Sequence, residues 1–193
     1  MYSVFKKLNV PFLAPVLCCL LLPVEGWAER SEPLFEPSKE LEGVRLDFVG
    51  GGILRYKGLF PVYDCALYLE KGTSPGNVLD PSALRLEFVY RVNAEADRFH
   101  AEGLRVLARN FDQASIESIK ERLDRINTLF PDARKGDRCA LTYIPGRGTE
   151  LTYNGESLGV IEGEDFARMY FAIWLGEKPA SKRLKKALIT TGS

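Results

Sequence analysis

The stretch that decides the fold is Asn154-Gly155, followed by Asp165-Phe166-Ala167-Arg168-Met169-Tyr170-Phe171-Ala172-Ile173-Trp174-Leu175-Gly176. Asn154-Gly155 lies between two short apolar runs, which is typical of a β-hairpin closed by a type I′ turn. The apolar residues of 164–175 recur at helical spacing, and Gly176 stands where such a helix ends. The sequence therefore predicts a strand hairpin that runs directly into a short amphipathic helix.

Strand-like patterns precede this stretch. Apolar and polar residues alternate, or short apolar runs occur between turn residues, in segments that predict strands at 44–48, 53–60, 62–69, 84–92, 138–144, 150–153 and 157–161. Three glycines at 50–52 separate the first of these segments from the second, so we expect a tight turn there. Residues 29–43 are polar and contain two prolines, and they predict only a lead-in without periodic structure.

Helical periodicity appears in three further segments, 94–110, 113–130 and the basic amphipathic stretch 180–189. Strands, two central helices, a β-meander and terminal helices predict an α+β domain, in which helices cover one face of a large antiparallel sheet. Since such a sheet keeps its second face free, we expect that uncovered face to line a groove.

The N-terminus has the composition of a secretory signal. Lys6 and Lys7 precede an apolar run at 10–24, and Gly26-Trp27-Ala28 offers small residues at a cleavage site. An uncleaved anchor is the alternative, but the run contains three prolines and is shorter than the roughly 20 residues that a span needs. The sequence thus predicts a signal peptide at 1–28, export to the periplasm or beyond, and no membrane span in the mature chain.

The charge balance excludes one class of partner. The chain has 26 Lys or Arg and 26 Asp or Glu, and no basic run is interleaved with aromatic residues. Such a chain has no global field that attracts a polyanion, so we expect no nucleic-acid partner.

Removal of residues 1–28 leaves Cys65 and Cys139 of the four cysteines. In an exported protein they can form one disulfide, or each can be a buried thiol within a strand, and the sequence leaves both open. One histidine and two separated cysteines have no chelating spacing, so we expect no metal and no other cofactor. His100 lies on the apolar stripe of its predicted helix, which favours a core or half-buried position over catalysis.

Arg55 is the sharpest candidate for a binding residue. It follows the three glycines and neighbours an apolar strand that contains Tyr63 and Tyr68. A guanidinium that faces an apolar, tyrosine-lined sheet suits one carboxylate or phenolate on an apolar ligand. The alternative is a surface arginine with a solvated head. Asp64 is either exposed at a sheet edge or the partner of Arg55.

Three motifs in order resemble the bacterial chalcone isomerase-like domain: Gly50-Gly51-Gly52-Ile53-Leu54-Arg55, then Val62-Tyr63-Asp64-Cys65-Ala66-Leu67-Tyr68-Leu69, and the Asn154-Gly155 hairpin leading into Phe171-Ala172-Ile173-Trp174-Leu175-Gly176. The resemblance covers roughly residues 40–190 and implies an open-faced β-sandwich of the chalcone isomerase type over 44–193. Plant chalcone isomerases close a chalcone into a flavanone, assisted by an arginine after the glycine turn together with a threonine, a tyrosine and an asparagine. Related plastid proteins use the corresponding arginine, with a tyrosine, to hold a fatty-acid carboxylate.

The resemblance implies ligand-binding roles for three residues: Arg55 matches the family arginine, Tyr63 falls at the plant threonine, and Phe99 falls at the plant tyrosine. The plant asparagine falls near Val106. Since Phe99 and Val106 cannot perform the same chemistry, the resemblance argues against flavonoid cyclisation.

Three functions follow. The first is a non-catalytic, exported binder of a fatty acid or a similar apolar carboxylate. The alternative is an intramolecular lyase or isomerase of chalcone-like enones, in which Arg55 stabilises the oxyanion. A third is an envelope module whose basic tail, with Lys182, Arg183, Lys185 and Lys186, contacts a partner or anionic lipid. The sequence leaves open whether the protein is an enzyme.

Overall fold

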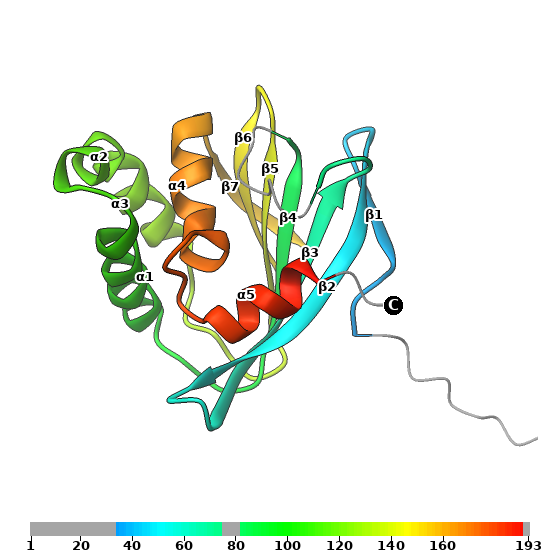
Figure 1. Ribbon diagram of the computed structural model, residues 1–193, viewed down its shortest axis with the longest axis horizontal. Helices are drawn as coiled ribbons and strands as arrows, with labels where there is room; N and C mark the ends of the chain where they lie inside the picture. Colours follow the sequence, from blue (N-terminus) through cyan, green and yellow to red (C-terminus); the bar gives the residue numbers. More distant parts are fainter. Residues whose placement is uncertain (1–33, 75–81, 191–193) are drawn as a thin grey trace, which may run out of the picture. The chain divides into compact units, whose positions relative to one another are not determined.

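The computed structural model describes residues 34–74 and 82–190. Their strands form one seven-stranded antiparallel sheet whose strand order equals the chain order (Figure 1). The strands are β1 (Ser38–Leu41), β2 (Val44–Tyr56), β3 (Phe60–Glu70), β4 (Leu84–Tyr90), β5 (Arg138–Ile144), β6 (Gly148–Tyr153) and β7 (Glu156–Ile161). The predicted α+β class with a large antiparallel sheet is confirmed. The predicted signal peptide, 1–28, lies outside the described residues.

Helices cover one face of the sheet (Figure 1). They are α1 (Ala96–Asn110), α2 (Gln113–Ser118), α3 (Lys120–Leu129), α4 (Glu164–Leu175) and α5 (Lys182–Ile189). The predicted helix 113–130 is therefore two helices, because the backbone leaves the helical region at Ile119 (φ −112°, ψ 7°) while its side chain is buried. Within 34–74 and 82–190, no helix has the length and hydropathy that crossing a membrane requires.

The main core lies between the sheet and the helices. Alternate residues of the strands point into it, among them Leu67, Leu86, Leu141 and Leu151, and α4 contributes its buried aromatic residues. Side chains on the opposite face form a second, smaller cluster around Leu46, Ala66, Tyr68 and Ala83. The period-2 alternation of strands thus divides the apolar residues between two unequal layers.

The three glycines at 50–52 do not form the predicted turn. Strand β2 continues through them, with a bulge between Phe48 and Gly50, and helix α5 packs against this part of the strand. A Cβ at Gly50 would lie 2.7 Å from the carbonyl oxygen of Leu188, and one at Gly52 would lie 2.8 Å from Cβ of Ala187. These glycines therefore permit close approach of a helix to a strand.

Strand β1 lies in the lead-in for which the sequence predicted no periodic structure. It pairs with β2 through a two-residue turn, Glu42-Gly43, in which both residues have positive φ (53° and 80°). Such a turn matches the twist of an antiparallel pair, and glycine at its second position was the available signal. The described fold consequently starts before residue 44.

Cys65 and Cys139 are both buried free thiols. Each is paired in register with Phe88, so strand β4 lies between the two sulfur atoms. Of the two possibilities that the sequence left open, the structure therefore has the buried thiols. Burial raises the pKa of Cys139 to about 12, which keeps this thiol protonated and unreactive.

Candidate functional site

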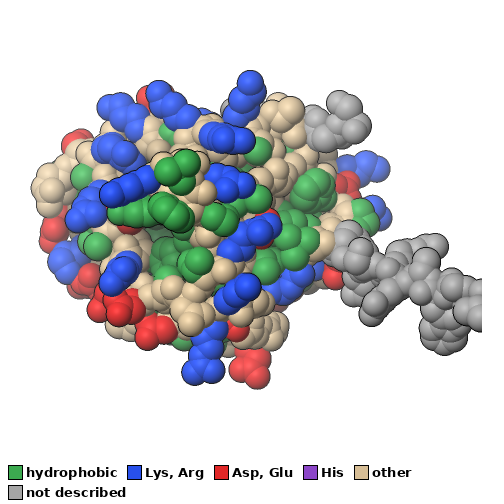
Figure 2. Space-filling view, turned by 90° about the horizontal axis from the view of Figure 1, so that it is seen from below, with side chains coloured by type: hydrophobic (Ala, Val, Ile, Leu, Met, Phe, Trp, Pro, Cys, Tyr) green, Lys and Arg blue, Asp and Glu red, His purple; other side chains and the backbone are tan. Residues whose placement is uncertain are grey.

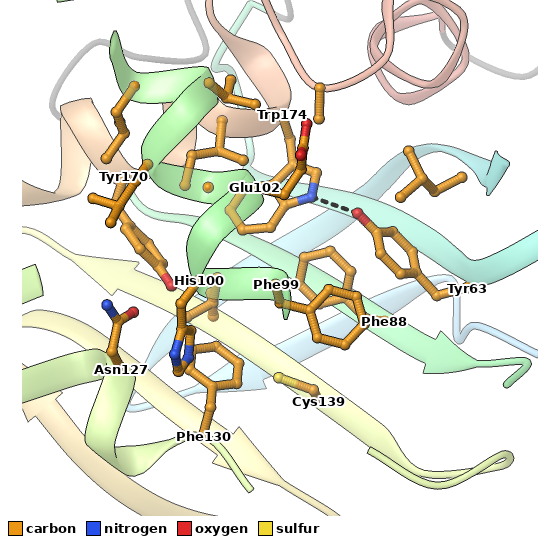
Figure 3. Close-up of a pocket in the computed structure, with 18 of the residues that line it drawn as sticks. Tyr63, Phe88, Phe99, His100, Glu102, Asn127, Phe130, Cys139, Tyr170 and Trp174 are labelled. Atoms are coloured by element: carbon orange, nitrogen blue, oxygen red, sulfur yellow. Dashed lines mark hydrogen bonds between the residues drawn. The ribbon is translucent and has the colours of Figure 1, made fainter. Parts of the chain in front are cut away.

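A cavity lies between the sheet and helices α1, α3 and α4 (Figure 3). The space between its side chains, including its opening to solvent, is about 810 Å³. The sheet wall consists of apolar and aromatic side chains from β2 to β5: Leu54, Tyr63, Phe88, Tyr90, Cys139 and Leu141. A predominantly apolar lining with few polar groups is typical of small-molecule sites.

The helical wall is apolar as well. Residues of α1, α3 and α4 line it together with two loop residues: Phe99, Gly103, Leu104, Val106, Leu107, Leu123, Phe130, Tyr170, Ile173, Trp174 and Ala180. Three polar side chains also line it: the imidazole of His100, the carboxylate of Glu102 and the amide of Asn127. Among the described residues, no arginine or lysine lines this cavity.

Two residues far apart in the sequence fix one side of the cavity. The indole Nε1–H of Trp174 donates a hydrogen bond of 2.9 Å to the hydroxyl oxygen of Tyr63 (Figure 3). Burial raises the pKa of Tyr63 above its ordinary value, so the phenol stays protonated and its O–H can donate into the cavity. The Tyr63 ring also makes edge contacts with Phe88 and Tyr90, which hold it in this orientation.

The other side of the cavity contains the polar groups of α1 and α3. In Figure 3 the His100 ring lies between the Asn127 amide and the Phe130 ring. The His100 and Phe130 ring centroids are 5.9 Å apart, in an edge contact. His100 is mostly buried, as the sequence predicted, and it also lines the cavity, which the apolar stripe alone did not indicate.

Comparison with known proteins identifies the family of this chain. A family model described as chalcone isomerase-like matches residues 33–190. The chain belongs to the chalcone isomerase-like family. No curated protein matches it by sequence. A fatty-acid binding protein from Arabidopsis thaliana has a similar fold, with a TM-score of 0.61 at 14% identity over 80% of this chain and 90% of that one.

In this chalcone isomerase-like protein, the predicted position of Arg55 is wrong. Its side chain is exposed, it donates a 3.2 Å hydrogen bond to the carbonyl oxygen of Leu59, and it does not line the cavity. The cavity itself lies on the helix-covered side of the sheet, whereas the sequence predicted a groove on the uncovered side. Successive residues of a strand point to opposite faces, and Leu54 lines the cavity whereas the next residue, Arg55, does not.

Tyr63 and Phe99 are the two predicted site residues that the structure brings together. Both line the cavity, and their ring centroids are 6.5 Å apart. Sequence reasoning missed Trp174 and Asn127 as lining residues. Trp174 lies in the helix that the sequence predicted best, but only the packing of α4 against β3 directs its indole N–H to Tyr63.

Asp64 has a partner that neither alternative anticipated. It is buried, and Arg91 binds both of its carboxylate oxygens, with Nε–Oδ2 at 2.6 Å and Nη2–Oδ1 at 2.8 Å. Arg91 follows β4, next to β3 in the sheet, so strand pairing alone brings these residues together. Asp64 therefore has a structural role on the uncovered face of the sheet, as the partner of Arg91.

The uncovered face contains a network of charges around Glu87. The Glu87 side chain is only 5% exposed and lies close to Arg138 (2.8 Å), Arg85 (3.3 Å) and Lys39 (3.7 Å). Arg85 also donates a hydrogen bond to Oγ1 of Thr142, and Arg138 donates one to the carbonyl oxygen of Leu34. Among the described residues, no group of His, Cys, Asp and Glu has the arrangement of a metal site.

Proposed function

We propose that this protein is an exported, non-catalytic binder of a fatty acid or a similar apolar carboxylate. The observation that carries the proposal is the cavity, whose two walls are almost entirely aliphatic and aromatic. Burial contributes about 0.8 kcal/mol per CH₂, so an alkyl chain supplies most of the affinity without any charged contact. The fold shared with a protein named as a fatty-acid binding protein supports the same class of ligand.

Tyr63 and Phe99 are proposed as direct ligand contacts. The Tyr63 O–H is a donor held in place by Trp174, and the Phe99 ring forms part of the wall beside it. A ligand-binding role for Arg55 stays a prediction from the sequence, because its guanidinium is exposed and lies outside the cavity lining.

Trp174 provides the test, because one of the chain's two tryptophans lines the cavity. The other, Trp27, belongs to the proposed signal peptide, so in the chain from Glu29 titration with dodecanoate is expected to change Trp174 fluorescence saturably, at one ligand per chain. Gly103→Leu, which extends a side chain from α1 toward Ile173, is expected to lower the affinity at least tenfold. The matched control is Ala108→Leu on the exposed side of the same helix, and it is expected to bind normally.

Three further measurements test the role of Arg55, the class of ligand and the export of the protein. Arg55→Ala is expected to leave the affinity unchanged, and a large loss would return this arginine to the site. Failure of acids of several chain lengths to bind would contradict the proposal. Mass spectrometry of protein from its own host tests export and ligand together, since we expect a chain that begins at Glu29 and carries an apolar acid.

Membership of the chalcone isomerase-like family favours one alternative, an isomerase of chalcone-like enones. The same cavity would hold the substrate, and Tyr63 would donate to its carbonyl oxygen. Decay of the chalcone absorbance band faster than in buffer supports this alternative, and no acceleration removes it for that substrate class.

We also propose a weak envelope contact through α5. Lys182, Arg183 and Lys186 are exposed on this helix, while Leu184 and Leu188 are buried beneath it. Such a basic surface suits anionic lipid.

A further inference from the structure

The cavity contains one buried polar atom without a partner. Nε2 of His100 is buried and has no hydrogen-bond partner among the described residues. Buried nitrogen and oxygen atoms are nearly always paired, so such an atom in a cavity indicates a missing ligand or water. Asn127 of α3 lines the same side of the cavity and offers an amide donor (Figure 3).

The surroundings of His100 favour a neutral imidazole. On its own helix, Asp97 Oδ1 lies 3.9 Å from Nδ1 but is fully exposed, and Glu102 is exposed and paired with Arg105. Helix α3 presents the neutral Asn127, and α4 presents Tyr170, whose pKa burial raises above its ordinary value. On the sheet wall, burial likewise raises the pKa values of Tyr63, Tyr90 and Cys139. Burial also lowers the pKa of His100.

We propose that His100 and Asn127 receive the carboxyl head group of the ligand, and that the bound carboxyl and imidazole share one proton between Nε2 and a carboxyl oxygen. The inference rests on the proposed function and specifies where the head group lies. With the proton of the neutral imidazole on Nδ1, the bare Nε2 and a carboxylate anion take one proton from solvent to form this pair. No covalent bond changes, and the proton returns to solvent on release.

Proton uptake gives a signed dependence on pH. Because the ligand raises the pKa of His100 in the complex, affinity for a carboxylate increases as the pH falls and decreases as the pH rises. Between about pH 6.5 and pH 8, the affinity for dodecanoate is expected to fall by up to about tenfold per pH unit. Dodecanol has the same chain and no titrating group, so its affinity is expected to stay constant.

Three variants separate titration from shape. His100→Gln keeps a hydrogen-bonding side chain but does not titrate, and it is expected to remove the pH dependence. His100→Phe is expected to weaken dodecanoate binding about tenfold or more, with dodecanol unaffected. The matched control Glu95→Gln removes an exposed carboxylate that precedes α1 and does not line the cavity, and it is expected to retain the wild-type pH profile.

The outcomes are distinguishable. If both ligands bind but dodecanoate affinity is independent of pH and of His100, the head group lies elsewhere and a water molecule occupies this end. If neither ligand binds, the proposed function fails, and the inference fails with it.

A second inference comes from the tip of the β2–β3 hairpin. The strands are joined by a tight turn at Lys57-Gly58, both with positive φ (49° and 73°). Tyr56, Leu59 and Phe60 flank it and are 61%, 71% and 64% exposed. The neighbouring strand β4 ends opposite Tyr63, so the tip projects beyond the rest of the sheet (Figure 1). Three large exposed apolar side chains at a projecting tip indicate a contact surface.

The charged residues near the tip indicate which kind of partner this surface binds. Arg55 and Lys57 lie among the apolar residues of the tip, and residues 52–63 include no acidic residue. Figure 2 views the molecule from the side of the tip and shows apolar side chains with Lys and Arg around them, while acidic side chains gather mainly toward one edge. Aromatic and aliphatic residues with adjacent cations suit the interface of an anionic bilayer.

The geometry points to an anionic lipid surface as the partner of the hairpin tip. Leu54, which lines the cavity, directly precedes Arg55, so a tip seated in the interface brings the cavity close to the lipid. This contact involves β2 and β3 and is separate from the proposed contact of α5.

Vesicle flotation of the chain from Glu29, without the apolar signal segment, tests this inference. We expect binding to vesicles of phosphatidylglycerol and phosphatidylcholine, and at least fivefold weaker binding to phosphatidylcholine alone. The triple variant Tyr56→Ser, Leu59→Ser, Phe60→Ser is expected to lose most of the binding. The control Lys182→Gln, Arg183→Gln, Lys186→Gln removes the α5 charges and is expected to lose less.

Two results overturn the inference. One is flotation that does not occur or does not depend on the tip. The other is a concentration-dependent dimer of the wild type that the tip variant abolishes, since the surface would then bind a second copy of the chain.

Discussion

Replacement of Glu87 by glutamine is expected to lower the free energy of unfolding by about 3–5 kcal/mol. The Glu87 carboxylate is buried among three cations, with Arg138 at 2.8 Å, Arg85 at 3.3 Å and Lys39 at 3.7 Å. Glutamine keeps the shape of the side chain but removes its charge. Arg85 and Arg138 then remain close together without the Glu87 carboxylate, while Lys39 keeps its pair with Glu36, and the uncompensated charge of the two arginines is the main cost. Urea unfolding followed by circular dichroism measures the change.

The matched control for this substitution is Glu95→Gln. The ion pair of Glu95 with Arg98 has a similar length, 3.0 Å, but both side chains are mostly exposed. Water screens such a pair, so the expected loss is below about 1 kcal/mol. Equal losses at the two positions would mean that the buried network contributes nothing beyond a surface pair.

The second large effect is expected at Gly50. A single methyl group in Gly50→Ala places a carbon 2.7 Å from the carbonyl oxygen of Leu188 and 2.9 Å from that of Thr190. These are backbone atoms of α5 and its end, so relief requires the helix to move away from β2. We expect a loss of about 3 kcal/mol or more, since overpacking adds to the exposure of Leu188. Thermal unfolding gives the size of the loss, and limited proteolysis after residue 176 detects release of the helix.

Gly51→Ala is the control in the same strand. Gly51 faces the other side of the sheet, where a Cβ would meet the carbonyl oxygen of Cys65 at 3.2 Å and the flexible ring of Phe48 at 3.5 Å. The expected loss is below about 1 kcal/mol. If both variants lose the same stability, the glycines matter for strand conformation and not for the approach of α5.

Local patterns were sufficient for most elements. The Asn154-Gly155 turn, the helix that ends at Gly176 and the alternation in β4 and β5 were all predicted, because each is encoded by neighbouring residues. Predictions were wrong where a distant segment decides the conformation. Glycine is equally compatible with a turn and with a strand that a helix must approach closely, so the glycines at 50–52 were assigned to a turn.

The candidate site divides in the same way. Tyr63 and Phe99 were predicted from a family resemblance, and the structure places both at the cavity. Arg55 was predicted to reach a groove on the uncovered face, but the cavity lies on the helix-covered face, and no local signal specifies which face holds a cavity. The partner of Asp64 was missed because Arg91 follows the neighbouring strand β4, 27 residues away in the sequence.

The sequence by itself determined the α+β class, the positions of most strands and helices, and the apolar residues available for a core, since hydrophobic periodicity and turn residues act locally. Only the tertiary structure decided which face of the sheet holds the cavity, which residues pair across it, and that Nε2 of His100 has no hydrogen-bond partner there among the described residues. The reason is physical: a cavity and a buried unpaired nitrogen are properties of packing between elements, which sequence periodicity does not specify.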